Sequence, residues 1–251
     1  MGPVTMLRLA ALAATALLAA CAGPGVPSSP PAAAAEAPLR WKALLVAADD
    51  AEPVFDNGVD SLRRSLVSFG VAPADIAVLK ADAPQPGAVA TKANFDRAVA
   101  DLAGPAGTGC FVYLTSHGVR DRGLYAAAEN AVIPPGYLAQ ALDGACAGRP
   151  TVLVTSGCYS GIYTDTPALT TPDRIVLTAA RADRPSFGCG TGDRTTYYDQ
   201  CFLDSLKRGA AWTAIAAEIS GCVARREQAK GFPASQPQSA FGRDAAGLTA
   251  F

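Results

Sequence analysis

Two residues of this chain can act together as a nucleophile and its acid–base partner. His117 is the only histidine in 251 residues, and it directly follows the apolar run 109–116. Cys158 follows a similar run, 150–157, 41 residues further on (158 − 117). A thiol attacks a carbonyl as its thiolate, which at neutral pH requires a base or an imidazolium nearby. Any Cys/His chemistry here must therefore use His117.

Small residues flank both candidates. Gly118 leaves room beside His117 for a substrate, and its backbone N–H is available to an oxyanion. The segment 155–161, Thr-Ser-Gly-Cys-Tyr-Ser-Gly, gives Cys158 similar room. A structural interpretation competes, because a histidine after a strand often only satisfies a local contact and a free cysteine often packs as a small hydrophobe. Position alone favours this second interpretation.

Both residues need a scaffold that brings two strand ends together. Short apolar runs predict buried strands, and apolar residues at helical spacing predict helices between them. Thr91 is expected to cap one helix, and Asn57 another that buries Val59, Leu62, Leu66 and Val67. The expected strands are 42–48, 76–80, 109–116, 150–157 and 173–180, with helices near 135–142, 202–206 and 212–223 and an edge strand within 231–251.

Strands that alternate with helices predict an α/β fold with a largely parallel sheet covered on both faces. Ligands of such sheets bind beyond the carboxyl ends of the strands. If the strands before His117 and Cys158 are neighbours, both side chains emerge at that edge, and the intervening residues suffice for one crossover helix.

The N-terminus predicts export. Residues 1–20 have one charge and an apolar segment of signal-peptide length, too short to span a bilayer as a mature helix. The sequence Leu-Ala-Ala-Cys ending at Cys21 resembles the lipobox of bacterial lipoproteins, which implies lipidation of Cys21; an ordinary cleaved signal is the alternative. Residues 21–39 are expected to tether the 40–251 domain. Ala22 favours the outer membrane, so the protein is expected in the bacterial envelope, facing the periplasm.

Composition excludes several classes of partner. After residue 21, 20 basic residues face 22 acidic ones, a net charge of −2 (20 − 22) without a basic patch, so nucleic acid is not an expected partner. With one histidine and no Cys-x-x-Cys, we expect no metal and no cofactor. An exported protein can pair cysteines. Cys189 and Cys201 are either a disulfide or free thiols, and Cys110 is expected in the core.

Three stretches resemble one family of peptidases: 112–118, 152–161 and 176–190. An apolar strand ending in His-Gly, then one ending in a small residue and Cys, resembles the caspase/legumain clan of cysteine peptidases. The similarity is greatest to the legumain (asparaginyl endopeptidase) family, which includes the GPI-anchor transamidase catalytic subunit, and it runs over residues 40–205. The resemblance implies a caspase-like three-layer sandwich, a mostly parallel sheet of about six strands.

The resemblance also assigns roles. It implies that Cys158 is the nucleophile, that His117 protonates the leaving amine, and that the N–H groups of Gly118 and Cys158 form the oxyanion hole. Ser186 and Asp199 align with residues that line the substrate pocket. The implied activity is that of an endopeptidase acting on protein or peptide through a thioester.

The chain departs from the family at several positions. Ser116 stands before the histidine, and Ser156-Gly157 stand before the cysteine, where the family usually has Ala next to the Cys. The asparagine that orients the histidine falls on Asp50. The Arg-His pair that recognises asparagine falls on Asp56-Asn57. A substrate pocket with Asp56 and Asp199 would be acidic and prefer a basic residue.

Three functions remain open from the sequence. A membrane-tethered cysteine endopeptidase or transpeptidase uses the same acyl-enzyme. A non-catalytic caspase-like lipoprotein would only bind a partner, and the intact Cys158/His117 pair argues against it. A thiol-dependent acyltransferase or redox protein is disfavoured by the absence of a Cys-x-x-Cys.

Overall fold

The computed structural model describes residues 1–2, 39–190 and 192–251. The expected signal peptide, lipidated Cys21 and most of the tether lie outside the described residues. The described residues from 39 onward belong to one unit of the chain, which ends at Phe251.

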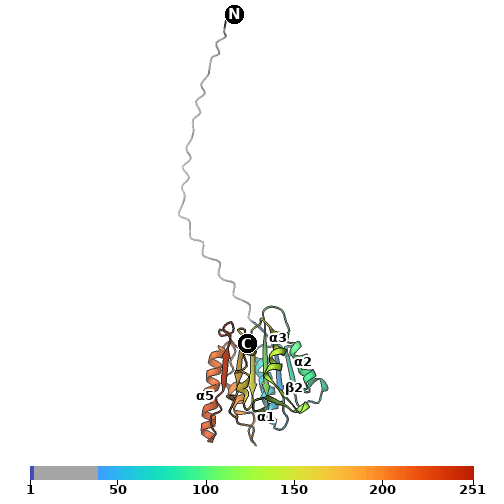
Figure 1. The fold of residues 1–251 in the computed structure, drawn as a ribbon, viewed down its shortest axis with the longest axis vertical. Helices are drawn as coiled ribbons and strands as arrows, with labels where there is room; N and C mark the ends of the chain where they lie inside the picture. The colour runs from blue at the N-terminus through green and yellow to red at the C-terminus, as the bar shows by residue number, and fades with distance from the viewer. Residues whose placement is uncertain (3–38, 191) are drawn as a thin grey trace. The chain divides into compact units, whose positions relative to one another are not determined.

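A six-stranded sheet forms the centre of the domain (Figure 1). Its strand order is β2-β1-β3-β7-β8-β9, and all neighbours are parallel except β8 and β9. The strands are β1 Arg40–Ala47, β2 Ile76–Lys80, β3 Thr108–Thr115, β7 Thr151–Ser156, β8 Arg174–Thr178 and β9 Gln238–Phe241. Each expected strand is present within two residues at either end, including the C-terminal edge strand.

The two central strands are buried along their full length, as their unbroken apolar sequences require. Strands β3 and β7 are parallel neighbours, with Thr115 paired to Ser156 at their last residues. The next residues of both strands therefore leave the sheet at the same edge. The prediction that His117 and Cys158 share this edge is confirmed.

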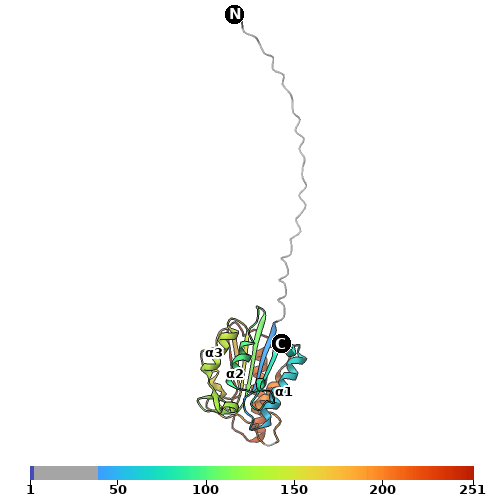
Figure 2. The same cartoon turned by 90° about the vertical axis from the view of Figure 1, so that its right-hand side faces the viewer.

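Helices cover both faces of the sheet, which confirms the predicted layers (Figures 1 and 2). On one face pack α1 Pro53–Ser68, α4 Tyr197–Ser205 and α5 Trp212–Lys230. On the other pack α2 Lys92–Ala100 and α3 Pro135–Cys146. Short 3-10 turns are η1 Pro73–Asp75, η2 Pro86–Ala88, η3 Ala127–Glu129 and η4 Ser160–Ile162. Of the helices in the described ranges, none is long and apolar enough to cross a membrane.

The helix caps show how far local sequence decides helix ends. Thr91 caps α2 as expected, accepting from the N–H of Asn94. The expected cap at Asn57 is wrong, because α1 begins at Pro53, a residue preorganised for a first helical turn. Val67 was expected in the core but is 38% exposed.

A small second sheet was not expected from the sequence. It is antiparallel, in the order β4-β5-β6. Its strands are β4 Gly118–Val119, β5 Gly123–Ala126 and β6 Ala131–Ile133, too short to show a periodicity. The first of them begins directly after His117, so this sheet is part of the site's scaffold.

Two disulfides connect elements of the domain. Cys110 pairs with Cys146, and Cys201 with Cys222. The suggested Cys189–Cys201 bond is therefore wrong, since Cys201 bonds to α5. Cys110 is fully buried as expected, although as half of a disulfide. In the described part of the chain the free thiols are Cys158 and Cys189.

Candidate active site

The imidazole of His117 is held by a carboxylate from the neighbouring strand. Its Nδ1 lies 2.7 Å from Oδ2 of Asp49, a buried residue just beyond β1. Because a carboxylate only accepts, Nδ1 carries the proton and donates it. The other carboxylate oxygen accepts from the N–H of Ala51 at 2.9 Å, which fixes the carboxylate. Phe55 of α1 lies edge-on to the ring at 5.1 Å. The ring orientation is thus set from two elements.

The identity of this carboxylate corrects the sequence analysis. Asp50 was expected to orient His117, but Asp50 is exposed and Asp49 makes the contact. Ala48 still follows the sheet, since its N–H donates to the carbonyl of Thr115, and the chain then turns inward at Asp49. Which of two adjacent aspartates faces inward depends on where the strand ends.

The surroundings of His117 favour its charged form. The contact with Cys189 is the largest influence that raises the pKa of His117, to about 9, and Asp49 raises it further while burial opposes both. The side chain is nevertheless 41% exposed. An imidazole that is protonated at neutral pH and reachable from solvent can act as a general acid.

The Cys158 sulfur lies against Ser186. The backbone N–H of Ser186 donates to Sγ at 3.3 Å, and the carbonyl oxygen of Ser186 lies 3.5 Å away. The Ser186 hydroxyl is 3.9 Å from the same sulfur. Ser186 was expected to line the substrate pocket, and the structure places it directly on the candidate nucleophile. It precedes α4 by eleven residues (197 − 186), so only the folded chain brings it here.

The backbone of Gly118, the residue after His117, packs directly against the backbone of Cys158. A Cβ built on Gly118 would lie 1.7 Å from the carbonyl oxygen of Cys158 and 3.0 Å from its nitrogen. No side chain fits there, which explains the glycine after His117. In the described residues the N–H of Cys158 has no hydrogen-bond acceptor. Two adjacent amide groups at this corner are suited to bind an oxyanion.

The departures at Ser116 and Gly157 have structural reasons. The Ser116 hydroxyl is buried and donates to the carbonyl of Tyr125 at 2.6 Å, which ties β3 to the small sheet. A Cβ at Gly157 would lie 2.5 Å from the Leu124 side chain and 2.6 Å from the Ser116 carbonyl. Both residues therefore fit the small sheet against the catalytic corner.

The two acidic residues expected in the substrate pocket, Asp199 and Asp56, have different surroundings. Asp199 is fully buried, and the Thr115 hydroxyl donates to its Oδ2 at 2.9 Å. Burial raises the pKa of Asp199, while hydrogen bonds from Ser156, Tyr113, Thr115 and Thr196 lower it.

Asp56 pairs instead with Lys80 of β2, 3.4 Å away. Lys80 is the last residue of β2, the outer strand of the sheet, and Asp56 lies in the first turn of α1. Asp199 is thus buried and Asp56 is paired with a lysine, and the preference for a basic residue stays a prediction.

Sequence reasoning missed Asp49 and Cys189. Asp49 had a signal, because it stands beside the residue that was chosen. Cys189 had none in its spacing, and it raises the pKa of His117 from the segment before α4. Among residues 39–190 and 192–251 no group of three or more His, Cys, Asp or Glu is arranged to hold a metal.

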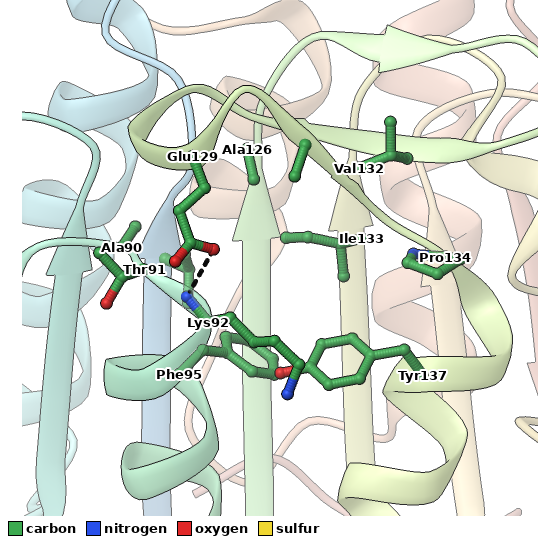
Figure 3. Close-up of a pocket in the computed structure, with 12 residues that line it drawn as sticks. Ala90, Thr91, Lys92, Phe95, Ala126, Glu129, Val132, Ile133, Pro134 and Tyr137 are labelled. Atoms are coloured by element: carbon green, nitrogen blue, oxygen red, sulfur yellow. Dashed lines mark hydrogen bonds between the residues drawn. The ribbon is translucent and has the colours of Figure 1, made fainter.

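A separate apolar pocket of about 260 Å³ lies between α2, α3 and β6 (Figure 3). Phe95 and Tyr137 form part of its wall, and Glu129 accepts from the backbone N–H of Lys92 at its rim. Its lining includes neither His117 nor Cys158, so it is not the catalytic site.

A cysteine and a histidine at the carboxyl edge of a parallel sheet with helices on both faces define the class of caspase-like α/β proteins. Accordingly, the structure is similar to the crystal structure of caspase-1 from Spodoptera frugiperda, with a TM-score of 0.57 and 14% sequence identity. The match covers 81% of this chain and 86% of the caspase chain. At this identity the likeness shows the fold alone.

A comparison with protein-family profiles adds a match in sequence. The profile of the peptidase C13 family matches residues 107–215, which include β3, His117, β7 and Cys158. No curated protein sequence matches the chain. Residues 107–215 are thus similar to the peptidase C13 family, and the domain has a caspase-like fold; both findings support a cysteine peptidase. A peptidase of this kind acts on protein or peptide substrates.

Proposed function

We propose that this protein is a cysteine endopeptidase in which Cys158 is the nucleophile and His117 the general acid. One observation carries the proposal: the backbones of Gly118 and Cys158 are packed so closely that the two residues form a single corner. The corner combines a free thiol, an imidazole held by Asp49, and the unbonded N–H of Cys158.

The reaction follows from this arrangement. The Cys158 thiolate attacks the carbonyl carbon of the peptide bond, and the N–H groups of Gly118 and Cys158 hold the resulting oxyanion, each lowering the barrier by about 3 kcal/mol. His117 gives a proton to the leaving amine as the C–N bond breaks, which leaves a thioester on Cys158. Water then attacks the thioester and gives a proton to His117, and the C–S bond breaks to release the acid and the Cys158 thiolate.

Peptide acyloxymethyl ketones test this assignment. A library varied at the residue next to the reactive group is incubated with the wild-type domain, Cys158→Ala and His117→Ala. We expect an adduct on Cys158, mapped by peptide mass spectrometry, that is absent from Cys158→Ala. An adduct on Cys189 alone, or no adduct with any library member, would contradict the proposal and favour a binding protein without catalysis.

Transfer to an amine uses the same thioester. Adding a peptide with a free N-terminal amine during turnover separates the two outcomes, because a transpeptidase gives a ligated product and a hydrolase gives only the acid. We expect hydrolysis to dominate, since the His117 side chain is 41% exposed to solvent. A ligated product in excess of the acid would identify a transpeptidase.

We also propose that the protein acts in the bacterial envelope, anchored through a lipid on Cys21. The lipobox-like sequence before Cys21 supports the anchor, and the Cys110–Cys146 and Cys201–Cys222 disulfides support an oxidising compartment. Growth of a bacterial host with an alkyne fatty acid should label the full chain but not Cys21→Ser. Equal labelling of both would overturn the anchor, and Cys158→Ala controls for acylation at the active site.

A further inference from the structure

Arg120 stands at the turn of the hairpin that begins directly after His117. Strand β4 ends at Val119, and the N–H of Arg122 donates to the carbonyl of Val119 at 3.1 Å, which closes the turn. Asp121 within the turn has φ +58°, in the left-handed region. Because the turn is short and hydrogen-bonded, Arg120 has a defined place three residues after the general acid (120 − 117).

The guanidinium of Arg120 lies over the side chain of the residue that follows the nucleophile. Its central carbon is 4.4 Å from the centroid of the Tyr159 ring. Tyr159 is fixed in turn, since its N–H donates to the carbonyl of Arg184 at 2.8 Å. Gly118 packs against the backbone of Cys158, so the hairpin contacts both the nucleophile and the residue after it. Arg120 therefore lies beside the catalytic corner.

The charge of Arg120 has no counterion in the described part of the chain. Arg120 is exposed, and among residues 39–190 and 192–251 no carboxylate forms an ion pair with it. Arg181, which follows β8, instead donates to the carboxylate of Asp183 at 2.7 Å. A guanidinium over an aromatic ring keeps its N–H groups for a carboxylate, which it binds in a bidentate way. Arg120 is thus ready to bind one negative charge.

We propose that Arg120 selects peptide substrates with Asp or Glu among the first two residues after the scissile bond. This selectivity rests on the proposed function, since it names the substrate class of the same site. In that reaction the acyl part is bonded to Cys158, and the leaving amine lies at the imidazole of His117, the residue before β4. The leaving part of the substrate therefore lies beside the hairpin. An extended chain covers about 7 Å in two residues, which an arginine side chain from the turn can reach.

The net charge of the turn also favours an acidic partner. Arg120 and Arg122 outnumber Asp121 in three consecutive residues, a charge of +1 (2 − 1), whereas the chain after residue 21 has a net charge of −2 (20 − 22). Arg122 is exposed too, and it forms no ion pair with a carboxylate of the described ranges. Local positive charge attracts an acidic residue of the substrate and repels a basic one.

Matched peptides test this selectivity. Internally quenched peptides share one sequence, with the residue before the scissile bond taken from the acyloxymethyl ketone library, and carry Glu, Gln or Lys at the first or second position after it. In the wild type we expect kcat/KM about fivefold higher for Glu than for Gln at one or both positions, with Lys below both. The ratio of Glu to Gln should fall to about one in Arg120→Gln, and Arg120→Glu should prefer Lys. Arg63 is an exposed arginine of α1, so Arg63→Gln makes the same change in charge elsewhere and should keep the wild-type ratio.

A ratio that does not depend on Arg120 would overturn the inference. This outcome is a ratio of about one in the wild type at both positions, or an unchanged ratio in Arg120→Gln. If no peptide is cleaved and no adduct forms on Cys158, the proposed function fails. The affinity of Cys158→Ala for the Glu and Gln peptides, measured by fluorescence anisotropy, then decides the inference: tighter binding of Glu that is lost with Arg120→Gln supports it, and equal binding overturns it.

Discussion

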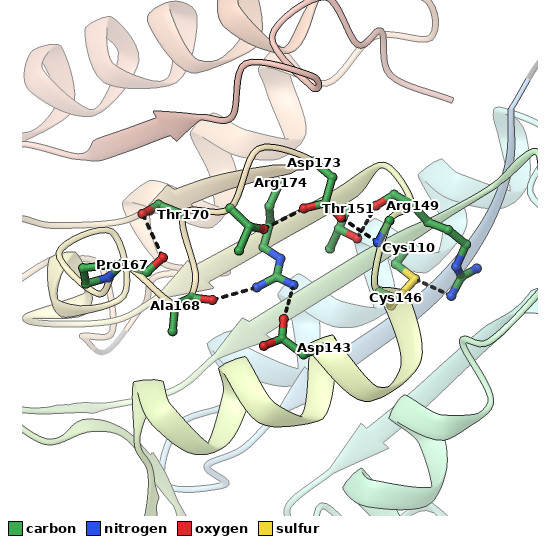
Figure 4. A network of polar contacts seen from close by, with 12 residues as sticks. Cys110, Asp143, Cys146, Arg149, Thr151, Pro167, Ala168, Thr170, Asp173 and Arg174 are labelled. Carbon is green, nitrogen blue, oxygen red and sulfur yellow. Dashed lines mark hydrogen bonds and ion pairs between the residues drawn. A yellow bond between two sulfur atoms is a disulfide. The ribbon is translucent and has the colours of Figure 1, made fainter.

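The two edges of the central sheet are built in opposite ways. At the amino edge, polar side chains are joined by hydrogen bonds and an ion pair, and two cysteines by a disulfide (Figure 4). Arg174, only 1% exposed, donates to Asp143 at 3.0 Å and to the carbonyl of Ala168 at 3.3 Å. Cys110 and Cys146 are joined in a disulfide. At the carboxyl edge both cysteines are free thiols and His117 is exposed to solvent.

This difference shows where the molecule keeps its reactive groups. A disulfide and an ion pair with a buried arginine constrain the chain and offer nothing to a ligand, so the amino edge contributes to folding. At the carboxyl edge, a free thiol, the oriented imidazole of His117 and the unbonded N–H of Cys158 can react with or bind a ligand, but they add little to the stability of the fold. Function at the carboxyl edge follows the general rule for parallel sheets.

Substitution of the candidate catalytic residues should have the largest effect. Cys158→Ala should reduce the turnover of a peptide amide by at least about 10³-fold, and His117→Gln should do nearly the same, because residues that act as a unit fail together. The thermal unfolding midpoint of both variants should stay within about 2 °C of the wild type. Residual turnover above a tenth of the wild-type value would contradict the assignment.

Gly118→Ala should cost about 10²-fold in turnover, because its Cβ would force the backbone away from the Cys158 carbonyl. Gly144→Ala in α3 is the matched control, since nothing lies within 4 Å of its added Cβ. That variant should keep full activity and gain up to about 1 kcal/mol in the free energy of unfolding. Similar turnover in both variants would show that the oxyanion corner is not needed.

Removing the disulfide at the amino edge should lower the stability of the fold without changing catalysis. Cys110→Ala with Cys146→Ala should lower the free energy of unfolding in urea by about 3 kcal/mol, because the bond spans 36 residues. Turnover at a temperature where the variant is folded should equal that of the wild type. A parallel loss of turnover would mean that the two edges are coupled.

The acidity of His117 should set the alkaline limit of activity. Amide turnover requires the protonated imidazole, so it should fall as the pH rises through about 9, and Asp49→Asn should shift this fall to lower pH. Because the folded pKa is raised, the stabilisation from the His117 contacts is complete below pH 6.5 and is lost as the pH rises through about 9. A pH–rate profile and unfolding curves at matched pH values measure both effects.

Asp199→Asn should have the smallest effect. Burial raises the pKa of Asp199, so the folded wild type binds this proton more tightly than the unfolded chain, and its charged form is destabilising at neutral pH. The variant should be as stable as the wild type or up to about 1 kcal/mol more stable at pH 7, with the difference shrinking as the pH falls. A variant much less stable at every pH would show that the Thr115 contact needs a carboxylate.

Local sequence predicted the parts of the site that lie on long apolar strands. His117 and Cys158 stand directly after β3 and β7, so their shared edge followed from strand pairing. Asp50 was chosen in place of Asp49. The side chains of two adjacent residues at the end of a strand point in opposite directions, and which of them points inward depends on where the strand ends. The burial of Asp199 was not predicted, because alignment by sequence position does not state which way a helix faces.

The sequence by itself determined the alternation of buried strands and helices, and with it the edge at which the single histidine and Cys158 lie. The tertiary structure alone decided which groups touch that histidine and the Cys158 sulfur. Asp49 and Ser186 come from segments far from these two residues in the chain, and their contacts depend on how loops close over the sheet. Hydrophobic periodicity is a local property that a sequence displays directly, whereas side-chain contacts between loops exist only after the packed core has placed their ends.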